Sequence, residues 1–250
     1  ATWMTFYFFL RTIRTGRITD SVLGGLFLGY LTLSWGGYYF VFYLLPMIVG
    51  ILILIKKYNT NVLIAYSGII GTALVIFSLY FGFNYNDLFT SLNVGGIFIF
   101  LILLIIYHLI YSKRDAFPRF YDGLINFLKW GLIPIIIVLA MILWINHEII
   151  PFGFGGRILS ILSPLVREGL SLTASVAEHM PSAWSVFYYN TLIPLIVIPL
   201  GLFFLFRRGN AADVLLIVFM LTLFYFTGSM IRIILLFAPA ACLVGAYGLS

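Results

Sequence analysis

The sequence is short of charge. Only 9% of its 250 residues are Asp, Glu, Lys or Arg, whereas 63% are hydrophobic. Because soluble domains contain about 25% charged residues, this composition excludes an ordinary soluble protein. The apolar residues occur in repeated runs of about 20, long enough for helices to cross a bilayer, and without the alternation of an outer-membrane barrel. The sequence therefore predicts an all-α polytopic membrane protein.

Cysteine and the common catalytic motifs are also scarce. The single cysteine, Cys242, lies in an apolar run, which excludes an intramolecular disulfide framework. Walker loops, CxxC, HExxH and Gly-x-Ser-x-Gly motifs are all absent from the sequence. The chain starts inside an apolar run at Ala1, without an initiator Met or a signal-peptide n-region. We therefore expect a piece of a larger protein that begins partway through a helix.

The apolar runs divide the chain into about nine expected helices, of which the first is partial. The runs are followed by short loops, except for one long interruption from 146 to 185. Loops of that length usually have a function. The expected helices cover 1–10, 18–34, 40–55, 62–83, 94–111, 124–145, 186–206, 214–227 and 231–249.

Basic residues gather in alternate loops. The loops at 11–17, 56–57, 113–129 and 207–208 contain eleven of the 14 Lys and Arg residues. By the positive-inside rule these loops are cytoplasmic. Loop 146–185 and the turn at Trp35-Gly36-Gly37-Tyr38 are then external. Trp35 and Tyr38 are typical interface aromatics, although the two glycines would also let a substrate approach the backbone.

The long loop contains adjacent acidic and imidazole side chains, Glu178 and His179. Pro181 follows, and Trp184 stands where the next helix should begin. One interpretation is a re-entrant loop in which Glu178 and His179 satisfy each other; the other is a functional carboxylate. Elsewhere, Asp20 and Asp213 lie at expected helix starts, where a carboxylate caps free amides and complements the helix dipole.

Arg232 is the second informative residue, because it lies between apolar neighbours. An arginine at the centre of a membrane helix costs about 2.5–3.5 kcal/mol on insertion scales. A guanidinium offers two parallel donors to a phosphate, so an anionic ligand is one explanation. The alternative is that Arg232 extends to the membrane interface.

Three separated blocks resemble the membrane domain of the oligosaccharyltransferase catalytic subunits, the Stt3/AglB/PglB family. Ser34-Trp35-Gly36-Gly37-Tyr38 with Leu45-Pro46 is similar to a family SWGGY…LIP segment. Ser175-Val176-Ala177-Glu178-His179, with Pro181 and Trp184, looks like the loop motif SVSEHQPTTW of the archaeal and eukaryotic branch. Met230-Ile231-Arg232, with Ala238-Pro239 and Cys242, is similar to a family helix.

The resemblance implies a GT-C type transmembrane bundle with one long external loop. It also implies transfer of a glycan from a lipid-linked oligosaccharide, on a polyprenyl or dolichyl phosphate or diphosphate, to Asn in Asn-X-Ser/Thr of an acceptor polypeptide. By this resemblance Glu178 contacts the acceptor amide and binds Mn²⁺ or Mg²⁺, with Ser175, Val176, Ala177 and His179 in the acceptor loop. Arg232 is implied to hold the carrier phosphate, and Trp35 and Tyr38 are candidates to line the substrate site.

The resemblance further implies a multi-pass protein of an archaeal plasma membrane or of the endoplasmic reticulum, with its active face external or lumenal. Membrane lipids and other oligosaccharyltransferase subunits are expected partners, and nucleic acid is not. The family's other metal ligands and its soluble C-terminal domain are absent from this chain, so we expect the 250 residues alone to be inactive.

Two alternatives stay open at this point. A transporter or flippase for a lipid-linked substrate would use Arg232 as its anion site, but it needs polar residues facing the cytoplasm, and only His108 is found there. No internal repeat supports an inverted-repeat transporter. Another polyprenyl-phosphate sugar transferase would share the architecture without needing an SVAEH acceptor loop.

Overall fold

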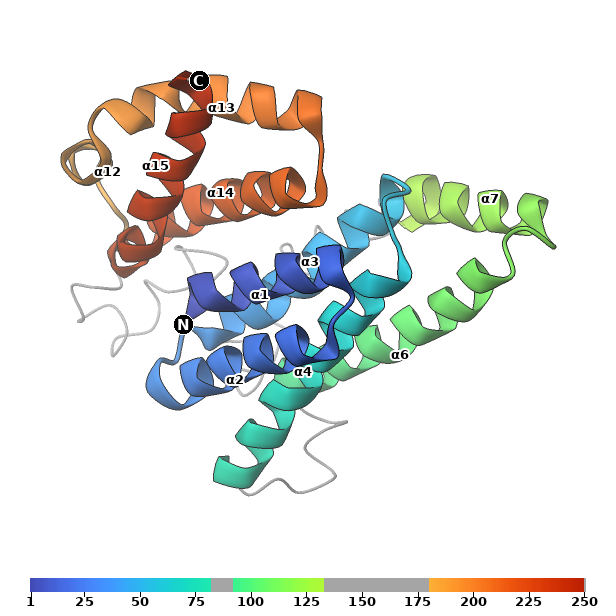
Figure 1. Ribbon diagram of the computed structural model, residues 1–250. Coiled ribbons are helices and arrows are strands. Elements are labelled where there is room, and N and C mark those ends of the chain that lie inside the picture. Colours follow the sequence, from blue (N-terminus) through green and yellow to red (C-terminus); the bar gives the residue numbers. More distant parts are fainter. Residues whose placement is uncertain (82–91, 133–179, 250) are drawn as a thin grey trace, which may run out of the picture. The chain divides into compact units, whose positions relative to one another are not determined.

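The computed structural model describes residues 1–81, 92–132 and 180–249, all of which form helices and short turns (Figure 1). The chain divides into two compact units, Ala1–Ile142 and Leu143–Ser250. The described part contains no strand, so the predicted all-α class is confirmed.

The first unit is built from six described helices. Short turns connect α1 to α2, α2 to α3 and α3 to α4, so successive helices run back and forth. The helices are α1 (Thr2–Thr15), α2 (Ile18–Ser34), α3 (Tyr38–Leu54), α4 (Thr60–Phe81), α6 (Leu92–Ser112) and α7 (Pro118–Phe127), with a π-helical turn at Leu128–Leu132 after α7.

Glycines let α2 and α4 pack closely in the core of this unit. A Cβ on Gly25 would lie 2.5 Å from Thr72 Cβ and 2.7 Å from the carbonyl oxygen of Ile69. A Cβ on Gly29 would collide with Ile76. Small residues at such a contact allow two backbones to approach, as is common between membrane helices.

The second unit contains four described helices. They are α12 (Trp184–Thr191), α13 (Ile193–Arg208), α14 (Ala211–Ser229) and α15 (Ile234–Leu249), and a 3₁₀ turn at Ile231–Ile233 precedes α15. Here α13 and α15 pack through Gly201 and Gly248, since a Cβ on Gly201 would meet the carbonyl oxygen of Val244.

Four helical segments are long and apolar enough to cross a membrane: Thr60–Tyr80, Gly95–Ser112, Ala211–Ser229 and Ile231–Leu249. The pair α12 and α13 would make a fifth if it is counted as one bent span, and α2 and α3 are shorter apolar helices. These spans support an integral membrane protein.

Two expected helices differ from the structure. The span expected at 186–206 is two helices, α12 and α13, which meet at 87°. Leu192 at the bend has φ 48°, and Pro194 stands in the first turn of α13. A proline removes one amide donor and clashes with the preceding helical turn, which favours a break here, and the positive φ of Leu192 turns the chain.

The other difference is at the helix expected at 124–145. Its described part begins six residues earlier, as α7, with Pro118 in the first helical turn, a position that favours proline. Helix α7 thus overlaps the expected span from residue 124 onward and continues directly into the π-helical turn Leu128–Leu132.

Candidate functional site

The junction between α14 and α15 presents Arg232. Helix α14 ends where Met230 takes an extended conformation (φ −142°, ψ 120°), and the 3₁₀ turn Ile231–Ile233 follows. This break leaves carbonyl groups at the end of α14 and amide groups at the start of the next helical segment without intrahelical partners.

Residues Met180 and Ser182 supply partners for both sides of this break. The amide of Ser182 donates to the carbonyl oxygen of Gly228 at 3.1 Å, and its hydroxyl donates to that of Thr227 at 2.5 Å. In return, the amide of Ile231 donates to the carbonyl oxygen of Met180 at 3.1 Å. Three hydrogen bonds therefore fix residues 180–182 against the turn that contains Arg232.

This contact joins two of the sequence blocks that lie about 50 residues apart. Met180 directly follows the Ser175–His179 motif in the chain, and Ile231 directly precedes Arg232. The candidate residues Ser175, Val176, Ala177, Glu178 and His179 lie outside the described residues. Their continuation along the chain is nevertheless anchored beside Arg232.

The Arg232 side chain is partly buried, and its Nε atom is fully so. Within the described residues this Nε has no hydrogen-bond partner. A buried donor without an acceptor is costly, and in native proteins it calls for an explanation such as a bound ion or water. An anion at Arg232 would satisfy this atom, whereas simple extension of the side chain into water would leave Nε exposed.

Aromatic side chains hold α12 against the same two helices. Phe187 is buried and meets the Phe237 ring edge-on, with centroids 5.2 Å apart. Phe187 and Trp184 both contact Phe224 of α14. Helix α12 begins at Trp184, where the sequence predicted the next helix.

Trp35 and Tyr38 lie in the first unit, at the turn between α2 and α3. Tyr38 is only 7% exposed and packs against the rings of Tyr39, Phe42 and Phe77. A Cβ at Gly37 would collide with the Trp35 indole, so this glycine is needed for the indole to fold over the turn. Packing alone thus accounts for Gly37 and Tyr38 at this turn. A role of Trp35 and Tyr38 in lining the substrate site stays a prediction.

Sequence reasoning missed Ser182, whose backbone and side chain make two of the three bonds to the α14–α15 junction. The only available signal was its place between Pro181 and the start of α12, where a hydroxyl commonly bonds to backbone. The imidazole of His108 has a hydrogen-bond partner, since its Nδ1 lies 3.2 Å from Tyr58 Oη.

The metal site was predicted at Glu178. Among residues 1–81, 92–132 and 180–249, no group of three or more His, Cys, Asp or Glu residues could hold a metal ion. The described residues therefore do not form a metal site by themselves.

Comparisons with known proteins agree on one family. The family model described as "Oligosaccharyl transferase STT3, N-terminal" matches residues 1–245. The rice (Oryza sativa subsp. japonica) dolichyl-diphosphooligosaccharide–protein glycosyltransferase subunit STT3B is 32% identical over 254 residues, covering 99% of this chain and 34% of the rice protein. The Dictyostelium discoideum subunit STT3 is 29% identical, covering 98% of this chain and 34% of its own length.

The fold has a solved counterpart. The archaeal oligosaccharyltransferase AglB from Archaeoglobus fulgidus, determined with an inhibitory peptide and a dolichol-phosphate, superimposes with a TM-score of 0.66 at 14% identity, over 99% of this chain and 32% of that structure. The chain thus spans about a third of the length of the relatives it matches. With the α-helical membrane fold and the family match over residues 1–245, the chain belongs to the oligosaccharyl transferase STT3 family.

Proposed function

We propose that the protein containing this chain transfers a glycan from a polyprenyl or dolichyl phosphate or diphosphate to the side-chain amide of Asn in Asn-X-Ser/Thr. The observation that carries this proposal is the set of three hydrogen bonds that fix Met180 and Ser182 to the Arg232 turn. They support an arrangement in which the acceptor loop ends beside a cation that suits the carrier phosphate.

Arg232 has the role of holding the carrier phosphate. Its buried Nε lacks a partner among the described residues, and a guanidinium fork matches two phosphate oxygens. During transfer the bond between the sugar's anomeric carbon and the phosphate oxygen breaks, and its electron pair stays on that oxygen. A fixed cation at this point stabilises the charge that develops there.

Glu178 has the role of orienting the acceptor amide. An amide nitrogen is a poor nucleophile because its lone pair is delocalised into the carbonyl group. A carboxylate that accepts its N–H bonds holds the nitrogen toward the anomeric carbon and reduces this delocalisation. As the new carbon–nitrogen bond forms, the nitrogen gives up one proton to a carboxylate base.

The divalent cation, Mn²⁺ or Mg²⁺, belongs to the same proposal. Glu178 is its one proposed ligand in this chain, and the remaining ligands would come from other parts of the whole protein.

The proposed setting follows from the charges. Eleven of the 14 basic residues lie in alternate loops, which supports an external or lumenal acceptor loop. The proposed membrane, an archaeal plasma membrane or the endoplasmic reticulum, rests on the family resemblance. The proposed partners are the lipid-linked donor, the acceptor polypeptide, membrane lipids and other subunits of the enzyme.

The Glu178→Gln variant of the full-length protein tests this function. The change keeps the size of the side chain and removes its charge, so glycan transfer to an Asn-X-Thr peptide should fall by about 10²-fold or more. Transfer is measured by mass spectrometry of the peptide. Glu148→Gln in the same loop is the matched control and should stay near the wild-type rate. A loss of transfer in Glu148→Gln, with none in Glu178→Gln, would show that Glu178 is not the functional carboxylate.

A further inference from the structure

Helix α7 and the turn before it have a polar side and an apolar side. Arg119, Asp122 and Asn126 follow one another at helical spacing on the polar side. Phe120 and Phe127 lie seven residues apart on the apolar side and are 62% and 58% exposed. A helix of this kind lies in the interface between headgroups and acyl chains.

Contacts with α6 and with the turn between α3 and α4 fix the orientation of α7. Tyr121 Oη lies 2.9 Å from Tyr107 Oη of α6, and Ile125 is fully buried. Lys56, in the turn between α3 and α4, donates to Asp122 Oδ1 at 2.8 Å. These bonds hold α7 by one side, so that Phe120 and Phe127 stay exposed.

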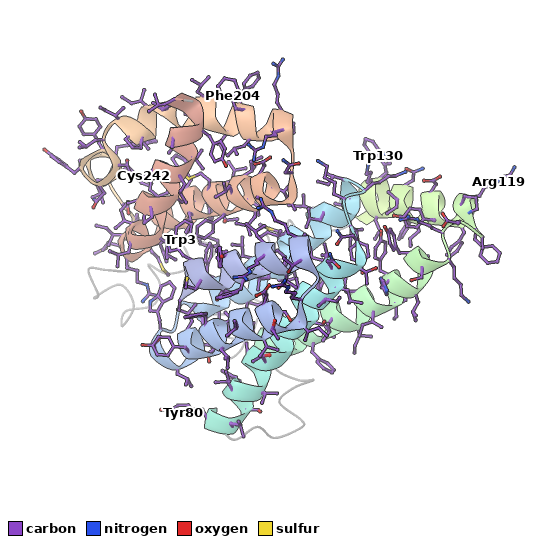
Figure 2. All side chains as sticks on the ribbon, in the orientation of Figure 1. Trp3, Tyr80, Arg119, Trp130, Phe204 and Cys242 are labelled. Carbon is purple, nitrogen blue, oxygen red and sulfur yellow. The ribbon has the colours of Figure 1, made fainter. Side chains whose placement is uncertain are left out.

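The segment has unneutralised positive charge. Residues 113–129 include four basic and two acidic side chains, and each acid already has a cation: Asp115 pairs with Arg114 at 3.6 Å, and Asp122 pairs with Lys56. In the part of the chain that the structure describes, Lys113, Arg119 and Lys129 make no ion pair. Figure 2 shows Arg119 and Trp130 extending outward from this region.

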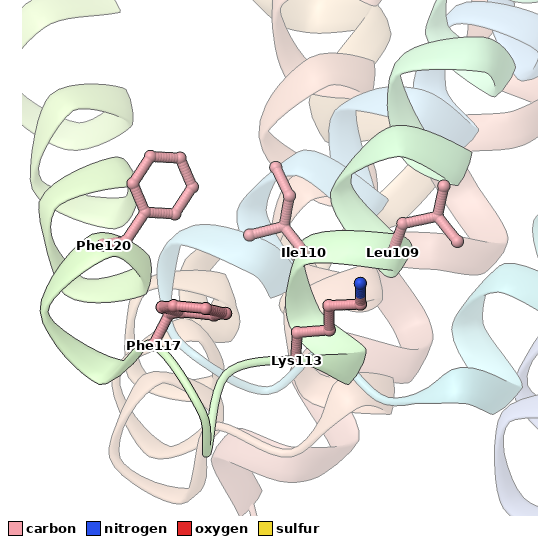
Figure 3. A pocket seen from close by; sticks show the side chains of 5 residues that line it. All are labelled: Leu109, Ile110, Lys113, Phe117 and Phe120. Carbon is pink, nitrogen blue, oxygen red and sulfur yellow. The ribbon is translucent and has the colours of Figure 1, made fainter.

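A cavity of about 270 Å³ opens between the end of α6 and the start of α7. Leu109 and Ile110 line it from α6, and Phe117 and Phe120 line it from the α7 side (Figure 3). Of the described residues that line it, Lys113 is the charged one. The cavity thus combines an apolar cleft with an ammonium group that has no carboxylate partner in the described ranges.

We propose that this cavity, an open groove between α6 and α7, binds an anionic glycerophospholipid of the surrounding bilayer. Part of an acyl chain lies between Phe117, Phe120 and the end of α6, and the phosphate lies at Lys113. Charge complementarity selects this occupant, since the free cations of the segment match an acidic headgroup. Exposed aromatic residues beside them match the boundary between headgroup and chain.

Photo-crosslinking in nanodiscs tests the site. The full-length protein is placed in phosphatidylcholine nanodiscs that contain a trace of either phosphatidylglycerol or phosphatidylcholine with a photoreactive acyl chain. Mass spectrometry then measures labelling of peptides from residues 109–120. Phosphatidylglycerol should label them several-fold more than phosphatidylcholine does, and high salt should reduce the difference.

Variants separate a specific site from general attraction. Lys113→Glu should abolish the preference for phosphatidylglycerol, Lys113→Arg should keep it, and Phe120→Ser should reduce labelling by both lipids. Arg17→Glu, at an exposed basic residue that does not line the groove, is the matched control and should change nothing.

Three outcomes would overturn the inference. They are equal labelling by the two lipids, an equal effect of Arg17→Glu and Lys113→Glu, and release of a bound polypeptide by Lys113→Glu without any change in lipid labelling. The last would show that the groove binds protein. The inference requires only a bilayer, so glycan transfer in the same nanodiscs reports separately on the proposed function.

Discussion

Two buried carboxylates, Asp20 and Asp213, each pair with an arginine of the preceding helix. Asp213 is completely buried and accepts from Arg208 Nε at 3.1 Å and from the amide of Asn210 at 2.9 Å, as part of a capping box. Asp20 is 4% exposed and pairs with Arg11 Nε at 3.2 Å. In both turns a glycine with positive φ ends the first helix: Gly16 and Gly209.

Both acids lie in the first turn of a helix, as predicted, and the predicted capping bond is formed by Asp213. The partners of the Asp20 carboxylate lie in α1. This carboxylate reaches back to Arg11 and to the Thr15 hydroxyl, which donates to Oδ2 at 3.2 Å. The sequence predicted that the first helix ends at residue 10, whereas α1 extends to Thr15. Arg11 therefore lies in a helix and not, as expected, in a loop.

Asp213→Asn should destabilise the protein. The change removes a buried charge-assisted hydrogen bond and weakens the cap, at a cost of about 1.5–3 kcal/mol. Thermal unfolding followed by size-exclusion chromatography measures the loss. Asp122→Asn removes a carboxylate from an exposed pair with Lys56 and should cost only about 0–1 kcal/mol. Equal losses would show that burial of Asp213 adds nothing.

Ser182→Ala tests the contact between residues 180–182 and the Arg232 turn. It removes the hydroxyl bond to Thr227, worth about 1 kcal/mol, and should raise the acceptor-peptide KM by about fivefold. Ser185→Ala, at an exposed position in α12, is the control and should leave that KM unchanged. A similar effect of both variants would remove Ser182 from any role in positioning the loop.

Among the elements, the glycine contact between α2 and α4 determines how closely the first unit packs. Gly25 faces Thr72 and Ile69 across this contact, whereas Gly71, on α4, has open space where a Cβ would be. Glycine in a helix otherwise costs stability relative to alanine. The two positions should therefore respond to the same substitution with opposite signs.

Gly25→Ala should lower stability by about 1–3 kcal/mol because the added methyl overpacks the contact. Gly71→Ala should raise it by up to about 1 kcal/mol, through helix propensity alone. The two melting temperatures, measured in the same detergent, provide the check. A gain from Gly25→Ala would mean that α2 and α4 can separate without loss.

Most helices could be predicted from the sequence because apolar runs and turn residues mark their ends. The predicted start near Trp184 and the run at 18–34 correspond to α12 and α2. The bend at Leu192 was not predicted, because prolines also lie inside helices of this chain, such as Pro46 and Pro199, and Pro194 by itself therefore does not mark a break. Of the candidate site, Arg232 could be singled out as a cation among apolar neighbours, but the bonds of Met180 and Ser182 depend on tertiary contacts that the sequence does not display.

For the whole molecule, the distribution of basic residues predicts which loops face outward. In a background where the exposed Cys242 is replaced by serine, Met180→Cys and Ser171→Cys should react with an impermeant thiol reagent added outside. Ala116→Cys, in the basic turn before α7, should react only after the membrane is opened. Labelling with the opposite sidedness would contradict the proposed external acceptor loop.

The role of Arg232 is tested most directly by the donor dependence of glycan transfer in the full-length protein. Arg232→Ala should lower kcat/KM for the lipid-linked donor by about 10- to 150-fold, the equivalent of about 1.5–3 kcal/mol for bonds to a charged group, and should leave the acceptor-peptide KM nearly unchanged. Arg232→Lys keeps the charge without the two-donor fork, so its kcat/KM for the donor should lie between those of the wild type and Arg232→Ala. A loss confined to the acceptor-peptide KM, with donor use intact, would contradict a carrier-phosphate site at Arg232.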